Sequence, residues 1–455
     1  MASITPPRTS TPRPSSRSWR WFWLALGLSG TAAFSAAAGA LLAVGLTSTP
    51  LLQSSLSPDE EQIFGEGDRI SATDFRMPRL TRPVNILVMG VKVLTSDLEN
   101  PSRSAEDLGY HALVNDLDGL SDTMLLLGFD PADEKLAMLS LPRDTRTWVS
   151  GMGYTKLNEA NREGGPALAA SATSELLGDV SIDRYVRINV QGVEKLIDAL
   201  GGVEVYVPYD MQYQDDSQHL YINLKEGQQR LNGDQALQIL RYRYDGYGDI
   251  GRIQRQQTLI RALQEQALSP MTLTRLPKIL SVIRENIDTN LSLEEVLALV
   301  GFASRMDRSE VQQLLLPGDF SEAGYELSYW LPDERAIDRM MAQHFSHGAT
   351  LAALPSRGEV RIAIQDSTGD YYAIDDMIYR LEDAGYWNIV VVEDWREPLA
   401  ETRIIAQQGD TRLASELQGV LSLGEVRTES TGSLQSDITI AIGQDWVEAG
   451  YEAEY

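Results

Sequence analysis

The stretch from Trp21 to Leu46 is a predominantly apolar run of 26 residues that contains no charged residue. A helix of about 20 residues spans the hydrocarbon core of a bilayer, so this run predicts a transmembrane helix with some tilt. Residues 1–20 contain four arginines, no acidic residue and many Pro and Ser, which predicts a disordered basic tail. Because positive residues favour the cytoplasmic side, we expect the N-terminus in the cytoplasm and the chain from Thr47 onward outside it.

A cleaved signal peptide is the alternative interpretation of this run, since "SAAAGA" supplies the small residues of a cleavage site. The apolar core of a signal peptide is shorter than this run, so the length favours an uncleaved anchor. The prediction is a single-pass protein of the plasma (inner) membrane with an extracytoplasmic, periplasmic body.

Charge and composition exclude several classes of protein. The chain of 455 residues has a formal net charge of −26 and no cysteine. Disulfides, thiolate metal sites and a cysteine nucleophile are therefore excluded. A polyanionic chain repels nucleic acid at long range, so nonspecific nucleic-acid binding is not expected.

Alternation of strands and helices predicts an α/β fold with helices packed on a central sheet. Short aliphatic runs at 84–90, 123–130 and 135–141 predict neighbouring central strands. The segment 155–178 is predicted to be helical in two parts, because Gly164 and Gly165 interrupt it and Pro166 suits a first helical position. A second βαβ pattern begins after Gly358 and predicts a separate small α/β domain.

These patterns divide the chain into seven parts. The predicted parts are a basic tail (1–20), a transmembrane helix (21–46), a linker or stalk (47–82), a catalytic α/β domain (83–346), a linker (347–357), a C-terminal α/β domain (358–446) and a tail (447–455).

The segment "LRYRYDGYGDIGRIQRQQ" concentrates arginines in this acidic chain. Arg241 and Arg243 would point the same way in an extended segment, whereas Arg252, Arg255 and Gln256 would share one face of a helix. "GDIG" precedes that predicted helix, whose N-terminus offers free N–H groups to phosphate. Arginines on helices are also commonly solvated or paired with acids, and this pattern alone leaves both interpretations open.

A second cluster lies at the ends of two predicted strands. Asp122 stands before one strand, and Arg143 and Asp144 follow the next. Antiparallel pairing of these strands would bring the three residues together at one sheet edge, where Asp122 could help hold Mg²⁺ beside a phosphate. An N-terminal cap at Asp122 and an ordinary salt bridge at Arg143 are the alternative.

Six blocks, in order, resemble the motifs of the LytR–CpsA–Psr (LCP) family over residues 83–268. They are "SDTMLLLGFDP", "LSLPRDT", "KLNEA", "IDRYVRINVQGVEKLIDALGGVEVYVP", "LNGDQALQILRYRY" and "GDIGRIQRQQ". Residues 358–446 resemble the small C-terminal domain that accompanies many members. The resemblance implies a central mixed sheet flanked by helices around an apolar lipid pocket.

The resemblance implies an extracytoplasmic phosphotransferase. It would transfer a glycopolymer from a polyprenyl (undecaprenyl) pyrophosphate carrier to peptidoglycan, with Mg²⁺ or Mn²⁺ as cofactor. Matching the motifs by position gives catalytic roles to five residues, namely Arg143, Arg241, Arg243, Arg252 and Asp249. By the same match the pyrophosphate would be bound by Arg143, Arg241, Arg243, Arg252 and Gln256, and the metal by Asp122. Arg255, from the helical spacing, and Lys92, at a position where the chain departs from the family, are further candidates for the pyrophosphate.

The sequence departs from the family pattern after the first strand. Members usually have "GVD" there, with an Asp that partners Asp122 at the metal, whereas this chain has "GVK" with Lys92. Lys92 would neutralise phosphate itself, or Asp97, Asp116 or Asp118 would complete the metal shell. A non-catalytic polyprenyl-pyrophosphate-lipid binding module and a lipid-pyrophosphate phosphatase are the alternative functions. A membrane-bound transcription regulator is disfavoured by the acidic exterior.

Overall fold

The computed structural model describes residues 51–64, 70–72, 78–92, 117–215, 220–242, 248–306, 310–321, 328–345, 356–407 and 409–450. The predicted basic tail and transmembrane segment lie outside these ranges. Among the residues that are described, no helix is both long enough and apolar enough to span a bilayer.

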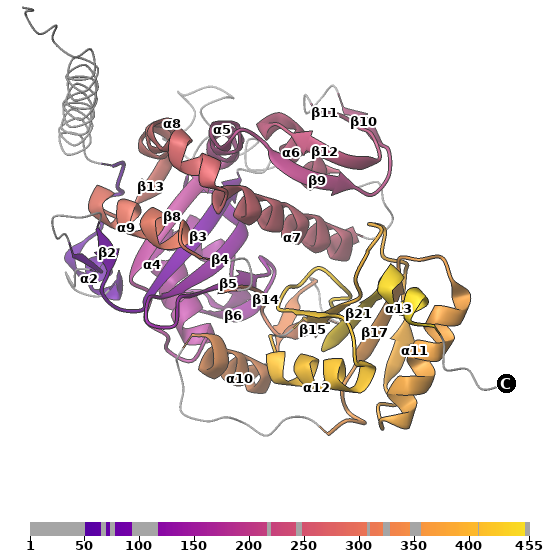
Figure 1. Ribbon diagram of the computed structural model, residues 1–455. Coiled ribbons are helices and arrows are strands. Elements are labelled where there is room, and N and C mark those ends of the chain that lie inside the picture. Colours follow the sequence, from indigo (N-terminus) through magenta and orange to yellow (C-terminus); the bar gives the residue numbers. More distant parts are fainter. Residues whose placement is uncertain are drawn as a thin grey trace, which may run out of the picture. The chain divides into compact units, whose positions relative to one another are not determined.

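A six-stranded mixed sheet is the centre of the first domain (Figure 1). In spatial order its strands are β13 (Ile287–Thr289), β8 (Arg184–Asn189), β3 (Val84–Lys92), β4 (Leu120–Asp130), β5 (Lys135–Leu141) and β14 (Val311–Leu315). The pairs β3–β8 and β5–β14 are parallel, and the other pairs are antiparallel. The three strands predicted to be central are therefore neighbours, and the mixed sheet is confirmed.

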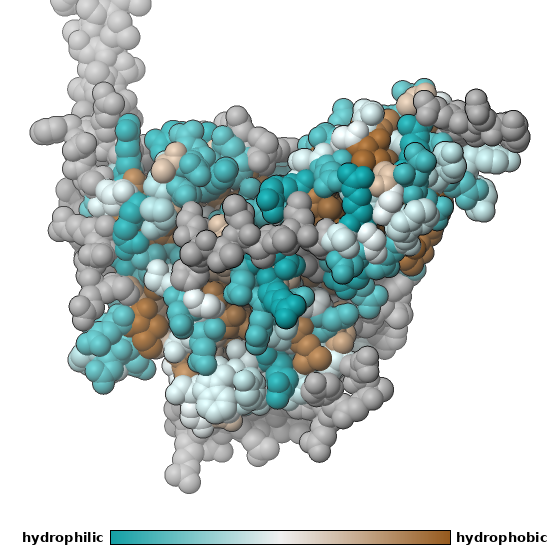
Figure 2. Space-filling model, turned by 90° about the horizontal axis from the view of Figure 1, so that it is seen from below, coloured by the Kyte–Doolittle hydropathy of each residue, from teal (hydrophilic) through white to brown (hydrophobic). Residues whose placement is uncertain are grey.

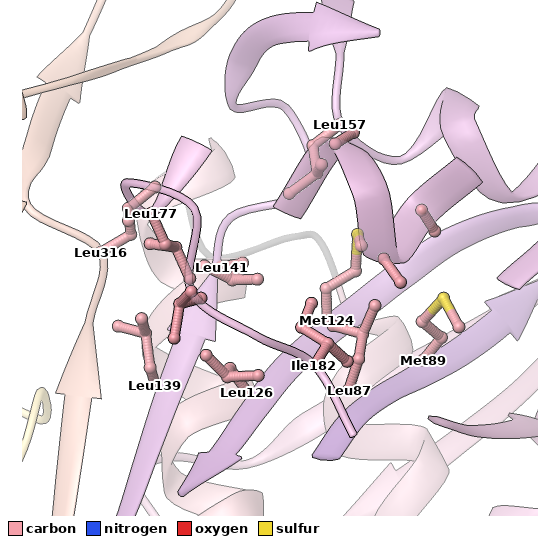
Figure 3. Close-up of a cluster of buried hydrophobic side chains, with 14 of the residues drawn as sticks. Leu87, Met89, Met124, Leu126, Leu139, Leu141, Leu157, Leu177, Ile182 and Leu316 are labelled. Carbon is pink, nitrogen blue, oxygen red and sulfur yellow. The ribbon is translucent and has the colours of Figure 1, made fainter. Parts of the chain in front are cut away.

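One face of this sheet carries the main hydrophobic core. Alternate residues of β3, β4 and β5 point to that face, and the register places Leu87 opposite Leu126 and Leu126 opposite Leu139. All three are fully buried. Figure 3 shows these leucines gathered with Met89, Met124, Leu141 and side chains of the adjoining loops, including Leu157, Leu177, Ile182 and Leu316.

Helix α4 (Glu159–Leu176) contributes small residues to this core, among them Ala167, Ala169 and Ala170. Its backbone is non-helical at Gly164 and Gly165, with φ of +63° at Gly165, and Pro166 begins the second part. The predicted two-part helix is confirmed. Glycine tolerates the positive φ because it has no Cβ.

Local capping explains the ends of α5 (Val190–Leu200), which follows β8 directly. The Asn189 side chain accepts a hydrogen bond from Gly192 N at 2.8 Å, and Gly201 at φ +87° ends the helix in the left-handed region.

The remaining elements of the first domain are helices and two-stranded antiparallel pairs. The helices are α2 (Pro58–Glu61), the 3₁₀ turn η1 (Gln62–Phe64), α6 (Gly233–Arg241), α7 (Gly248–Ala267), α8 (Pro270–Asn286), α9 (Leu293–Ala303) and α10 (Glu334–His344). The antiparallel strand pairs are β1 (Ser71–Ala72) with β2 (Arg79–Leu80), β6 (Arg146–Val149) with β7 (Gly153–Lys156), β9 (Val203–Val207) with β12 (Gly227–Leu231), β10 (Met211–Asp215) with β11 (Leu220–Leu224), and β15 (Gly318–Phe320) with β16 (Trp330–Pro332).

The predicted linker at 47–82 needs correction, because its described residues are part of the folded domain. Phe64 is 3% exposed and packs on Tyr185 with ring centroids 5.1 Å apart. Ser54 N and Oγ both donate to the Asp288 carboxylate, at 2.7 and 3.0 Å. This segment is mostly polar in sequence, but apolar side chains such as Phe64 are buried in the core by residues that are distant in the chain.

The C-terminal part has a sheet and a core of its own, in the order β18-β17-β21-β19-β20. Its elements are β17 (Ile362–Asp366), α11 (Tyr371–Asp383), β18 (Ile389–Val391), β19 (Arg403–Ala406), α12 (Thr411–Leu421), β20 (Glu425–Arg427), β21 (Ile438–Ile442) and α13 (Gln444–Ala449). Strand β21 is buried at every residue. Hydrophilic residues predominate over much of the face seen in Figure 2, where hydrophobic residues form small separate patches.

Candidate active site

The β4–β5 hairpin brings together the residues predicted for one sheet edge. Met124 of β4 pairs with Leu141 of β5, so Asp122 lies beside the turn that begins at Pro142. Arg143 Nη1 donates to Asp122 Oδ1 at 2.7 Å, and Arg143 Nε donates to Asp144 Oδ2 at 3.1 Å. The predicted juxtaposition is confirmed, although Asp122 lies within β4 and not before it.

Lys156 extends this cluster and was missed as a site residue. Its Nζ donates to Asp144 Oδ1 at 2.8 Å from the end of β7, and the ammonium lies 5.6 Å from the centre of the Tyr329 ring. Lys156 occupies the lysine of the "KLNEA" block, so the signal was present in the sequence. A lysine next to a strand end has many uses, and only the fold brings it to Asp144.

The resulting chain of alternating charges is Asp122, Arg143, Asp144 and Lys156. Each of the four side chains is between 16 and 23% exposed, so the cluster is mostly buried but still accessible to solvent. Burial lowers the pKa of Arg143, but Asp144 and Asp122 outweigh that effect and raise the pKa above its ordinary value. Arg143 is therefore a permanent cation, held by two carboxylates.

The third guanidinium nitrogen of Arg143 is directed at neither carboxylate. Within the described part of the chain, Nη2 makes no hydrogen bond. A guanidinium held by two of its nitrogens presents the third in a fixed direction, which suits a phosphate oxygen.

Helix α7 approaches the same edge through Gln256. Its Nε2 donates to Thr123 Oγ1 at 2.7 Å, and Thr123 is adjacent to Asp122. The helix begins at Gly248, so "GDIG" forms its first turn, whereas the sequence predicted that this segment would precede the helix. The N-terminal end of α7 therefore still belongs to the arginine stretch, as predicted.

The structure corrects the role of Arg255. Its side chain is 8% exposed, and Nη2 donates to the backbone carbonyl of Tyr242 at 2.7 Å. Successive residues of a helix are about 100° apart, so Arg255 cannot face the same way as Gln256. Arg255 therefore holds Tyr242, the residue that follows α6, and we leave it out of the phosphate-binding set that we propose.

Arg241 is the last residue of α6 and is half-buried, so the predicted extended pair with Arg243 is wrong at its first member. Arg243 lies outside the described residues. Lys92 ends β3, Asp249 lies in the first turn of α7 and Arg252 follows four positions after Gly248, but their side chains are likewise not described.

The described residues provide one predicted metal ligand, Asp122. Within these ranges, no group of three or more Asp, Glu, His or Cys side chains is arranged to hold a metal ion. Asp118 is 76% exposed and pairs with buried Arg187 at 3.4 Å. Asp97 and Asp116 lie outside the described ranges. Mg²⁺ commonly uses one or two carboxylates, several waters and the phosphates of its substrate, so a single protein carboxylate fits that ion.

Two family models match the chain. The LytR_cpsA_psr family matches residues 54–346, and a model described as LytR cell envelope-related transcriptional attenuator matches residues 359–446. The first match begins within the segment that the sequence predicted as a linker, in agreement with the folded position of Ser54 and Phe64.

Relatives of known name match most of the first domain. The polyisoprenyl-teichoic acid–peptidoglycan teichoic acid transferase TagV of Bacillus subtilis is 28% identical over 309 residues, covering 66% of this chain and 74% of the relative. TagU of Oceanobacillus iheyensis, with the same activity in its name, is 32% identical over 272 residues, covering 58% of this chain and 76% of the relative. The crystal structure of B. subtilis TagV superposes with a TM-score of 0.48 at 28% identity, covering 59% of this chain and 99% of that chain.

Proposed function

The chain belongs to the LytR_cpsA_psr family, and from that premise we propose that it transfers a glycopolymer from a polyprenyl pyrophosphate carrier to peptidoglycan. Relatives at about 30% identity are named as polyisoprenyl-teichoic acid–peptidoglycan teichoic acid transferases. The acceptor would be a hydroxyl of the peptidoglycan glycan, and the product a phosphodiester.

The arrangement around Arg143 is the observation that carries the proposal. A cation fixed by Asp122 and Asp144, with Nη2 left for a ligand, is arranged for an anion and not for a neutral substrate. Lys156 adds a second cation at 2.8 Å from Asp144, and Gln256 bonds the middle of α7 to Thr123, the neighbour of Asp122. The arginines of the α6–α7 segment would complete the site for two linked phosphates, namely Arg241, Arg243 and Arg252.

The second face of the central sheet supports a place for the polyprenyl tail. Four apolar side chains in the middle of this face are only half-buried, although central strands normally bury theirs. They are Val88, Leu127, Met138 and Val186, and the register places Val88 beside Val186 and Leu127 beside Met138. Helix α7 contacts this face through Gln256, and α9 contacts it where Phe302 meets Phe129 at 5.8 Å. An apolar chain lying between these helices and the sheet would bury the four side chains.

The reaction would proceed by direct attack, without a covalent enzyme intermediate. A sugar hydroxyl of the acceptor would attack the phosphorus nearer the polymer, forming the new P–O bond as the bond to polyprenyl phosphate breaks. The fixed cations Arg143 and Lys156 would stabilise the charge that gathers on the phosphoryl oxygens. A carboxylate would accept the hydroxyl proton, and Asp144 and Asp249 are the candidates.

Magnesium is proposed as the cofactor, with Asp122 as its protein ligand. The ion would supply positive charge to the bridging and terminal phosphate oxygens when bound. Because Asp122 also accepts the bond from Arg143, it would hold the ion and orient the guanidinium together.

Membrane attachment through residues 21–46 completes the proposal. This uncharged run and the arginines before it are sequence features that support a single-pass anchor with the N-terminus in the cytoplasm. The catalytic domain would then face the extracytoplasmic side, where peptidoglycan lies.

Product analysis with purified full-length protein tests the function. The protein is incubated with a lipid-pyrophosphate-linked saccharide, Mg²⁺, and either peptidoglycan or no acceptor. Saccharide joined to peptidoglycan, dependent on metal, is the expected product. Free saccharide phosphate in both incubations would mean a phosphatase, and lipid binding without any product would mean a binding module.

A further inference from the structure

The outward face of the β6–β7 hairpin carries two exposed aromatic rings that the proposed chemistry does not use. Trp148 is 45% exposed and Tyr154 is 62% exposed. Large exposed aromatic side chains that adjoin a functional site are candidates for ligand contact.

The register of the hairpin explains why these rings face outward together. Trp148 pairs with Tyr154, and Arg146 pairs with Lys156. Side chains alternate between the faces of a strand, and the intervening Thr147 is 5% exposed while Val149 is fully buried. The inner face of β6 packs against the protein, so Arg146, Trp148, Tyr154 and Lys156 share the outer face.

The two rings hold each other in a defined arrangement. Their centroids are 5.4 Å apart at an interplanar angle of 78°, which is the edge-to-face geometry that aromatic pairs prefer. The Arg146 guanidinium lies 4.5 Å from the centre of the Tyr154 ring. A ligand would therefore meet rings that are already oriented, with little loss of side-chain entropy on binding. We call Trp148, Tyr154 and Arg146 the aromatic platform.

The aromatic platform is continuous with the phosphate site. Lys156 lies on the same outer face as Arg146 and donates to Asp144 at 2.8 Å. Two residues along a strand span about 7 Å, so the Trp148–Tyr154 pair lies one short step beyond the Lys156 position. Strand β16 borders the same place, since its Trp330 N donates to the Asp144 carbonyl at 2.9 Å.

We propose that the aromatic platform binds a sugar ring of the peptidoglycan acceptor and so positions its hydroxyl at the phosphate site. This inference rests on the proposed function. The C–H groups of a pyranose ring carry partial positive charge and lie well on the negative face of an aromatic ring. A saccharide also has polar groups for the Arg146 guanidinium, which an acyl chain lacks.

The acceptor needs such a surface more than the donor does. In the proposed function the donor would be held through two phosphates by fixed cations and through its tail by the apolar face of the sheet. The glycan of the acceptor has neither phosphate nor lipid, so ring stacking and hydrogen bonds are the interactions open to it.

A sedimentation assay tests the proposal directly. Full-length protein in lipid nanodiscs is mixed with insoluble peptidoglycan, and the bound fraction is measured without any donor. The double variant Trp148→Ala/Tyr154→Ala should bind at least about tenfold more weakly, because central aromatic anchors commonly carry most of a binding energy. Trp148→Phe and Tyr154→Phe should bind within about threefold of the native protein, since each retains a ring.

A matched control is available in the C-terminal part, where Tyr372 is 63% and Trp387 is 67% exposed. The double variant Tyr372→Ala/Trp387→Ala should bind peptidoglycan as the native protein does. Equal loss in both double variants would mean nonspecific adhesion and would overturn the proposal. So would unchanged binding by the Trp148→Ala/Tyr154→Ala protein with an unchanged thermal unfolding midpoint.

Two further arms separate this inference from the proposed function and from other ligands. Binding of the lipid-linked donor is measured with the same variants; weakened donor binding with normal peptidoglycan binding would assign the aromatic platform to the donor and refute our assignment. Native protein that binds peptidoglycan through these rings but transfers nothing would refute the proposed function alone.

Discussion

Replacing Arg143 by Lys separates the charge at this position from its geometry. The guanidinium uses Nη1 for Asp122 at 2.7 Å and Nε for Asp144 at 3.1 Å, and Nη2 remains for the phosphate. An ammonium has one nitrogen and cannot reach both carboxylates and the ligand from the same backbone position. The variant therefore keeps the charge and loses the arrangement.

The expected cost differs for stability and for transfer. Hydrogen bonds to charged groups contribute roughly 1.5–3 kcal/mol each, and about a fifth of each side chain here is exposed, so the low end applies. Loss of one such bond should lower the free energy of unfolding by about 1.5 kcal/mol. Loss of one oriented donor to a transition-state oxygen should lower the transfer rate by about a hundredfold.

The assay measures transfer of a labelled lipid-linked saccharide to peptidoglycan, together with thermal unfolding of the same samples. Arg162→Lys is the matched control, because Arg162 pairs with Glu163 at 3.1 Å in an exposed bridge of the same domain. It should change neither quantity measurably. If Arg143→Lys transfers within threefold of the native rate, the geometry of the guanidinium does not matter, and the proposed role of Nη2 as an oriented phosphate donor is wrong.

Contacts of Gln256, Asp288 and His344 give three other predictions. Gln256→Ala loses the 2.7 Å bond to Thr123, so α7 should be less well held against β4 and transfer should fall about tenfold, with little change in thermal unfolding. Asp288→Ala leaves Arg187 charged at 3% exposure without its 2.7 Å partner, so chemical denaturation should show a loss of about 3–5 kcal/mol; Asp133→Ala, at an exposed 3.9 Å bridge, should show none. Burial lowers the pKa of His344, so the unfolded chain binds a proton below about pH 6.5 that the folded chain does not, and stability should fall as pH drops below that value. Thermal unfolding midpoints measured above and below pH 6.5 check the His344 prediction. If the His344→Gln variant loses stability with falling pH as the native protein does, the prediction is wrong.

Sequence patterns were sufficient to predict those elements whose residues are stable in one environment only. The aliphatic runs of β3, β4 and β5 have no stable place except the middle of a sheet, and the turn between β4 and β5 is too short for any pairing but antiparallel. Asp122 and Arg143 flank those runs, so their contact could be predicted before the structure was known. The interrupted helix α4 was predictable for the same reason, since Gly164 and Gly165 disfavour an unbroken helix.

Other roles depend on contacts between segments that are distant in the chain. Ser54 and Phe64 read as parts of a polar linker, yet Asp288 and Tyr185, more than a hundred residues away, give them buried partners. Arg255 is of a residue type, and at a helical spacing, that suits a phosphate ligand, but its guanidinium donates a hydrogen bond to the carbonyl of Tyr242.

Sequence patterns alone predicted that β3, β4 and β5 are neighbours and that Asp122 lies near Arg143, because the strands have a clear periodicity and the turn between β4 and β5 is short. The six ordered motifs likewise carried the resemblance to the family. The tertiary structure decided which cations remain available to a ligand, since Arg143 and Arg255 differ only in what surrounds them. It also decided that Lys156, Trp148 and Tyr154 lie on one face beside Asp144, because strand register is a property of paired segments and not of either one alone.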